Sequence, residues 1–127
     1  MTMMQLTPFL PVRDVEEAVR FYEAVLGFKC TARRAGYAHL KRDQVALRII
    51  SAAAGKDMGS PDSQLHLYVD VDDVDQLYNE LKEALSELPE NRCKPLFNTT
   101  YGRREFHVID NDVTLISFGS PQKREFE

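Results

Sequence analysis

The sequence lacks the features that mark several large classes of protein. No apolar run approaches the roughly 18 residues that a membrane-spanning helix needs, and the first residues have neither the basic nor the apolar region of a signal peptide. The net charge is −4, whereas a nucleic-acid binder relies on positive charge to neutralise phosphates. We therefore expect a cytoplasmic protein that has no membrane partner and no nucleic-acid partner.

Cysteine and histidine are also scarce. The two cysteines, Cys30 and Cys93, form no CxxC pair, and neither has a histidine at metal-ligand spacing. No base flanks either thiol, and no serine or cysteine lies in a turn typical of a catalytic nucleophile. The residues alone therefore predict no metal site, no cofactor and no catalytic residue.

What the chain does contain is a well-marked amphipathic helix at about residues 15–26. Asp14 is a good N-cap, and Glu17 three residues later completes a capping box. Apolar residues recur at helical spacing through this segment. Gly27 can adopt the left-handed conformation that ends a helix.

The rest of the chain repeats this organisation. Strands are predicted at about residues 6–12, 28–32, 37–41, 45–50, 65–71, 94–98, 104–109 and 113–118. A second helix is predicted at about residues 74–85, with Asp72 or Asp73 as its N-cap. The segment 51–64 is rich in small and turn residues and is predicted to be a linker. Residues 120–127 are predicted to be a polar tail.

The two halves can be superposed by sequence. A shift of 59 residues aligns the first strand and helix of each half, and Asp14 then meets Asp73. A shift of 69 aligns the later strands and pairs Tyr37 with Phe106. In that alignment His39 and His107 fall at opposite parity, so we expect neither to be functional.

This repeat predicts an α+β fold of two paired βαβββ modules that form a curved sheet around a cleft. We expect a single domain with module 1 at about 6–50, the linker at 51–64, module 2 at about 65–119 and the tail at 120–127.

Two short sequence motifs resemble those of a known family. Residues 21–28 (FYEAVLGF) resemble the "FY…LGF" signature of the glyoxalase/bleomycin resistance/extradiol dioxygenase superfamily, the vicinal oxygen chelate fold. Residues 101–106 (YGRREF), followed by 110–112 (DND), resemble the motif of the family's second module. The two motifs occur in order in separate halves of the repeat, and the resemblance covers residues 6–119.

The resemblance implies four metal-ligand positions, one on the first and one on the last strand of each module. In this sequence they are Thr7, Arg48, His66 and Ser117. Only His66 is a normal ligand for a divalent metal, and Arg48 places a fixed positive charge where a cation would bind. The resemblance therefore favours a metal-free member.

The same positions still face the cleft if the resemblance holds, and strand alternation adds Phe9, Ile50 and Tyr68. Tyr101 and Arg103, in the turn that precedes a strand, are expected to close over the entrance. The predicted ligand-binding residues are therefore Thr7, Phe9, Arg48, Ile50, His66, Tyr68, Tyr101, Arg103 and Ser117. The alternatives are that Phe9 and Tyr68 belong to the core, that Arg48 only pairs with a carboxylate, and that His66 is a hydrogen-bonded relic of an ancestral metal site.

These features favour a non-catalytic, metal-independent small-molecule binding protein that resembles the bleomycin-resistance branch and forms a homodimer. Its ligand would be an antibiotic or a carboxylated metabolite. One alternative is a divalent-metal-dependent lyase or dioxygenase of the same superfamily with an atypical ligand set. A third is an interaction module whose cleft is vestigial.

Overall fold

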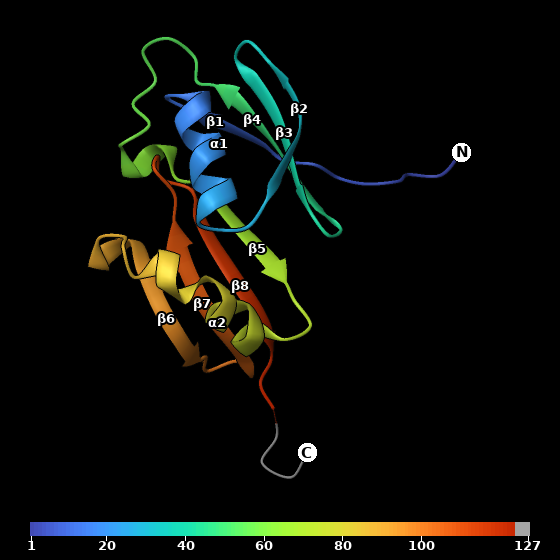
Figure 1. Cartoon of the computed structure of the whole chain (residues 1–127), viewed down its shortest axis with the longest axis vertical. Coiled ribbons are helices and arrows are strands. Elements are labelled where there is room, and N and C mark those ends of the chain that lie inside the picture. The colour runs from blue at the N-terminus through green and yellow to red at the C-terminus, as the bar shows by residue number, and fades with distance from the viewer. Residues whose placement is uncertain (124–127) are drawn as a thin grey trace. The chain divides into compact units, whose positions relative to one another are not determined.

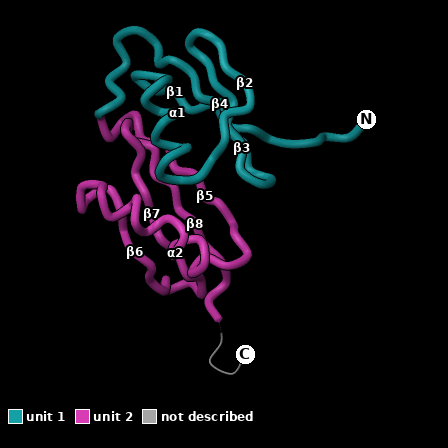
Figure 2. The backbone as a smooth tube through the Cα atoms, in the orientation of Figure 1, with its two compact units in different colours: residues 1–59 teal, residues 60–127 magenta. Residues whose placement is uncertain are grey.

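The computed structural model describes residues 1–123, so the last four residues of the predicted tail lie outside the described part. The chain divides into two compact units, residues 1–59 and 60–127 (Figure 2). Each unit combines one α-helix with one four-stranded sheet (Figure 1). The predicted α+β fold with two βαβββ modules is confirmed. That the two modules act as one domain around a cleft stays a prediction.

The first unit has the sheet order β1-β4-β3-β2, in which β1 is parallel to β4 and the other neighbours are antiparallel. Its elements are β1 (Phe9–Val12), α1 (Val15–Ala24), β2 (Lys29–Arg34), β3 (Tyr37–Arg42) and β4 (Val45–Ser51).

The second unit repeats this order as β5-β8-β7-β6, with β5 parallel to β8. Its elements are β5 (His66–Asp70), α2 (Val74–Leu85), β6 (Cys93–Asn98), β7 (Arg103–Ile109) and β8 (Leu115–Pro121). Two short 3-10 turns, Pro61–Ser63 and Glu90–Arg92, precede β5 and β6. None of the helices within residues 1–123 is long and apolar enough to cross a membrane.

Both helices begin at the aspartates that the sequence indicates. The Asp14 carboxylate accepts the backbone N–H of Glu17 at 3.2 Å, and that of Asp73 accepts the N–H of Gln76 at 3.0 Å. Each bond satisfies one donor that the first turn of a helix leaves unpaired. Gly27 has a φ of +75°, as expected for a residue that ends a helix, although α1 itself stops at Ala24.

Each helix covers one face of its own sheet and buries alternate residues of the strands. In the first unit the buried strand residues with the lowest exposure are Leu10, Val12, Ala38, Leu40 and Ile49. In the second unit Phe106 stacks on Phe118 with ring centroids 5.0 Å apart, and Tyr78 of α2 packs against Phe106. The remaining strand residues point to the opposite side of each sheet, which we call the helix-free face.

Several predicted boundaries are wrong by a few residues. The first strand begins at Phe9 rather than at residue 6, so Thr7 precedes it. The last strand runs from Leu115 to Pro121 rather than from 113 to 118, so the predicted tail begins inside a strand.

The predicted alignment of the third strands is also wrong, by one residue. Leu40 pairs with Leu47 across the first hairpin, whereas Val108 pairs with Ile116 across the second, so the second connection is longer by one residue. Because strand faces alternate, a slip of one residue exchanges the two faces.

The true register places the two histidines in equivalent positions. His39 pairs with Arg48 and His107 pairs with Ser117, both on helix-free faces. Tyr37 corresponds to Glu105 rather than to Phe106. The predicted opposite parity of His39 and His107 is therefore wrong.

Candidate functional site

The predicted ligand-binding residues divide between the helix-free faces of the two sheets. In the first unit, Phe9 of β1 pairs in register with Arg48 of β4, and Ile50 pairs with Tyr37 of β3. Thr7 lies just before β1, where its hydroxyl accepts a hydrogen bond from the Gln5 side chain at 3.2 Å. The face as a whole is thus built from three adjacent strands.

Arg48 is the centre of the first helix-free face. Its Nη1 donates to the Tyr37 hydroxyl at 2.7 Å, and its guanidinium carbon lies 5.8 Å from the centroid of the Phe9 ring. No carboxylate pairs with it among residues 1–123. Phe9 is 54% exposed, so the alternative that it belongs to the core is wrong. Arg48 therefore offers unused N–H donors between two aromatic rings.

In the second unit His66 of β5 and Ser117 of β8 are in contact. The His66 Nε2 lies 2.9 Å from the Ser117 Oγ, and Ser117 is 1% exposed. These are the first-strand and last-strand positions that the sequence singled out in module 2. Both side chains therefore satisfy each other by a hydrogen bond.

A buried carboxylate that the sequence reasoning did not select, Glu105 of β7, lies on the same face. It is 1% exposed, and both of its oxygens accept the Tyr101 hydroxyl, at 3.0 and 2.9 Å. Its Oε1 also lies 2.9 Å from the His107 Nε2. Because a carboxylate only accepts, this contact requires the proton on Nε2.

These hydrogen bonds set the ionisation of Glu105. Burial raises its pKa, but the hydrogen bonds from His107, Tyr101 and Tyr68 favour the carboxylate and outweigh burial. The pKa of Glu105 consequently lies below its usual range. The same interaction raises the pKa of Tyr101, whose hydroxyl is held as the donor.

Arg103 ties the edge of this face together. Its Nε donates to the Tyr68 hydroxyl at 3.0 Å, and its Nη2 donates to Asp70 at 2.6 Å. Its guanidinium carbon lies 5.4 Å from the centroid of the Tyr68 ring. The structure therefore brings Tyr68 and Arg103 together, and Tyr101 joins them through Glu105, while Tyr68 and Tyr101 keep 41% and 66% of their surface exposed.

Gly119 of β8 provides the room for this arrangement. It pairs in register with Glu105 and Asp70, and a Cβ built on it would overlap the Tyr68 hydroxyl and lie 3.0 Å from the Glu105 Cγ. Its backbone is not in the left-handed region, so the glycine is needed for space and not for conformation. Tyr68 can lie across β8 only because position 119 has no side chain.

The correct strand register identifies site residues that the sequence did not indicate. Tyr37 of β3 pairs with Ile50 on the first helix-free face. Glu105 and His107 lie two residues apart on β7, and His107 pairs with Ser117 on the second helix-free face. The alignment by a single shift of 69 put Phe106, a core residue, in the place of Glu105. The spacing of the paired residues in each hairpin carried the missing signal.

The positions that would hold a metal in this family do not fit one. His66 and Ser117 bond to each other, Arg48 is a cation, and Thr7 precedes its strand. Within residues 1–123 no group of three or more His, Cys, Asp or Glu side chains is close enough to bind a metal ion. This donor set does not suit a divalent metal ion.

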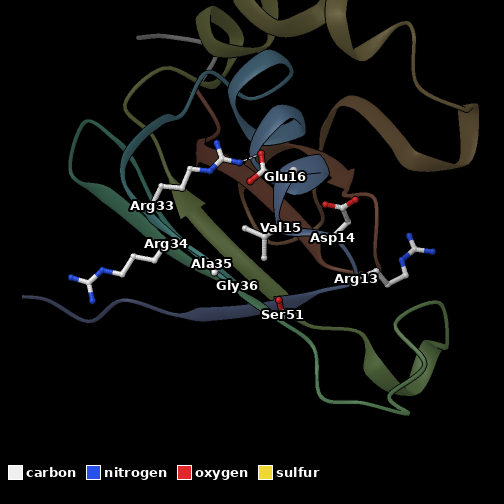
Figure 3. A pocket seen from close by; sticks show the side chains of 9 residues that line it. All are labelled: Arg13, Asp14, Val15, Glu16, Arg33, Arg34, Ala35, Gly36 and Ser51. Atoms are coloured by element: carbon white, nitrogen blue, oxygen red, sulfur yellow. Dashed lines mark ion pairs between the residues drawn. The ribbon is translucent and has the colours of Figure 1, made fainter.

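The first unit also contains a hollow of about 600 Å³ at the start of α1 (Figure 3). Three of its charged side chains already have structural roles, since Glu16 pairs with Arg33 and Asp14 caps the helix. None of its lining residues was predicted to bind a ligand. We therefore place the candidate site on the helix-free faces and not here.

Comparison with known proteins agrees with the fold and with the two sequence motifs. The family described as the Glyoxalase/Bleomycin resistance protein/Dioxygenase superfamily matches residues 5–118. A bleomycin resistance protein of Geobacillus stearothermophilus is 30% identical over 129 residues, covering 91% of this chain and 96% of the relative.

Solved structures give the same result. A bleomycin-binding protein complexed with bleomycin has a TM-score of 0.75 at 25% identity, over 96% of this chain and 100% of that one. An antibiotic-binding protein from Streptomyces sp. CB03234 has a TM-score of 0.71 at 25% identity, over 96% and 99% of the two chains.

The role of Gly119 gives a first prediction. Gly119→Ala is expected to lower the free energy of unfolding by about 1–3 kcal/mol, because the added methyl group displaces Tyr68. In a Tyr68→Ala background most of that loss should disappear, since the overlapping ring is gone. Urea denaturation of the four proteins in this cycle measures the coupling. Equal losses in both backgrounds would contradict the proposed packing.

The ionisation of Glu105 gives a second prediction. Its folded pKa is depressed, so its contribution to stability is complete above the unfolded pKa of about 4.3 and is lost as the pH falls through the folded pKa. Unfolding free energies measured between pH 6 and pH 2 should therefore fall more steeply for the wild type than for Glu105→Gln. Parallel pH curves for the two proteins would show that Glu105 has an ordinary pKa.

Proposed function

Because the chain belongs to the glyoxalase/bleomycin resistance protein/dioxygenase superfamily, we propose that it binds and sequesters a small organic molecule without transforming it. Support comes from relatives that are a bleomycin resistance protein, a bleomycin-binding protein and an antibiotic-binding protein. Each of them is matched over at least nine-tenths of this chain. The family therefore favours an antibiotic or a molecule of similar size.

The observation that carries the non-catalytic part is the chemistry of the four strand positions. A guanidinium at Arg48 repels a divalent cation, and the His66 Nε2 is already engaged with Ser117. The two helix-free faces therefore present aromatic rings together with a few hydrogen-bond donors. Such a composition suits recognition, in which an apolar body is oriented by a small number of polar groups.

The proposed ligand-binding residues of each unit lie at its helix-free face. On the first face the proposed residues are Thr7, Phe9, Arg48 and Ile50, to which the structure adds Tyr37 as the partner of Arg48. On the second face they are His66, Tyr68, Tyr101, Arg103 and Ser117, with Glu105 and His107 behind them.

A thermal-shift screen with bleomycin, other antibiotics and small carboxylates tests the proposal. A ligand present at 100 times its Kd should stabilise the fold by about 2.7 kcal/mol, seen as a rise in Tm of several degrees. The rise should shrink in Arg48→Ala or His66→Ala and persist in Arg20→Ala, whose side chain is exposed on α1.

Two outcomes would overturn the proposal. One is that no compound in the screen stabilises the fold. The other is that the purified, dialysed protein retains a full equivalent of Mn, Fe, Ni or Zn that is lost in His66→Ala, because the metalloenzyme alternative would then hold.

We further propose that the protein works as a homodimer. The segment before β1 is extended, and its apolar side chains are almost fully exposed: Met1 109%, Met3 89%, Met4 88% and Leu6 88%. Four large apolar side chains exposed within six residues are unfavourable in water unless a partner covers them. A second copy of the chain would provide that cover.

Light scattering tests the dimer directly. The full chain should have twice the mass of one chain, near 29 kDa given 14.6 kDa per chain. A variant with Met3, Met4 and Leu6 changed to Ser should dissociate at a higher protein concentration than the wild type, because it buries less apolar area. A monomeric wild type at high micromolar concentration would contradict the proposal.

A further inference from the structure

On the premise of the proposed function, we infer that the helix-free face of the first sheet takes an anionic aromatic molecule, an arene that carries a carboxylate or a similar acidic group. The inference rests on an uncompensated positive charge that lies among exposed aromatic rings.

The charge on this face has a single sign. The four strands of the first unit contain no Asp or Glu. Register and alternation put four of their cations on the helix-free face: Lys29, Arg34, Lys41 and Arg48. The two remaining cations lie on the helix side, where Arg33 pairs with Glu16 and Arg42 donates to the Leu26 carbonyl. Figure 3 shows Arg33 reaching Glu16 while Arg34 points away from α1.

Two of these cations face each other at a cost to stability. Lys29 of β2 pairs directly with Lys41 of β3, and both are exposed. Like charges in directly opposite positions destabilise a pair of antiparallel strands. Arg48 is on the next strand, diagonal to Lys41. A bound anion would relieve this repulsion, whereas a bound cation would add to it.

Arg48 supplies the geometry for a carboxylate. Its guanidinium is half-buried and held by the Tyr37 hydroxyl at 2.7 Å, which leaves most of its five N–H donors available. A fixed planar fork binds the two oxygens of a carboxylate together. The rings of Phe9 and Tyr37 flank the guanidinium and can pack against the body of the ligand.

The second helix-free face does not offer the same charge. Its Arg103 is bound to Asp70 and Tyr68, and its buried carboxylate Glu105 repels an anion. The net charge of the two units differs in the same direction. Residues 1–59 carry nine Lys or Arg and six Asp or Glu, while residues 60–127 carry seven and fourteen. An acidic group of a ligand is therefore better matched to the helix-free face of the first sheet.

A pair of naphthyl probes tests the inference. The chain contains no tryptophan, so naphthyl fluorescence can be followed against a low protein background. 2-Naphthoate and 2-naphthylmethylammonium share the ring and differ in the sign of the charge. Naphthoate should bind the full chain with one equivalent at saturation, at least about tenfold more tightly than the ammonium probe.

Variants locate the binding. Arg48→Gln should weaken naphthoate binding by about tenfold or more, Arg48→Lys by less because the charge remains, and Arg20→Gln not at all. Lys41→Gln should weaken naphthoate binding and also raise the midpoint of urea unfolding, because it removes the repulsion with Lys29. That second readout separates a lost ligand contact from a damaged fold.

The outcomes distinguish this inference from the proposed function. If the ammonium probe binds as tightly as naphthoate, or Arg48→Gln binds naphthoate normally, the inference is wrong while the proposed function stands on the antibiotic screen. If neither probe nor any screened compound binds, both fail. If a single-stranded oligothymidylate binds more tightly than naphthoate and depends on Arg48, the face recognises nucleic acid and the inference is overturned.

Discussion

The constraint on which the structure depends is that one helix can cover only one face of a four-stranded sheet. In each unit α1 or α2 packs on one face of its sheet and buries alternate residues of the strands that it covers, and the residues between them are left to face the other way. The core therefore takes the apolar half of each strand. The other half is free to vary in polarity, and there the chain places Arg48, His66, Tyr68, Glu105 and Ser117.

The two helix-free faces use this freedom in opposite ways. On the second sheet nearly every polar group has a partner, as in the bonds of Glu105 to Tyr101 and His107. Buried groups that are satisfied in this way fix the side chains in one arrangement. On the helix-free face of the first sheet, Lys29, Arg34, Lys41 and Arg48 have no acidic partner within the described residues, and Lys29 faces Lys41. Groups held without compensation in a stable fold are a common sign of a ligand site.

Features that depend on local sequence patterns could be predicted, whereas the strand register could not. The helix caps, the two amphipathic helices and the order of helices and strands along the chain follow from local patterns, and the structure confirms them. Local patterns cannot give register, because register depends on the length of each hairpin connection and on bulges. Bulges interrupt the pairing at Cys30/Ala32 and at Lys94/Phe97.

That limit explains which site residues the sequence missed. A difference of one residue between the two hairpins hid the equivalence of His39 with His107 and put Phe106 in the place of Glu105. The role of Gly119 depends on the side-chain conformation of Tyr68, which no spacing in the sequence encodes. Arg48 could be selected from the sequence because it lies on the last strand of its module, where the shift of 69 pairs it correctly with Ser117.

The central claim is that the ligand lies on the helix-free face of a sheet with Arg48 at its centre. Backbone NMR spectra of the isotope-labelled protein, recorded during titration with 2-naphthoate, test it most directly. The largest chemical-shift changes are expected at Phe9, Tyr37, His39 and Arg48, across β1, β3 and β4. Changes concentrated instead at the start of α1, around Asp14, Glu16 and Arg33, would place the ligand in the hollow beside the helix and would rule out a site centred on Arg48.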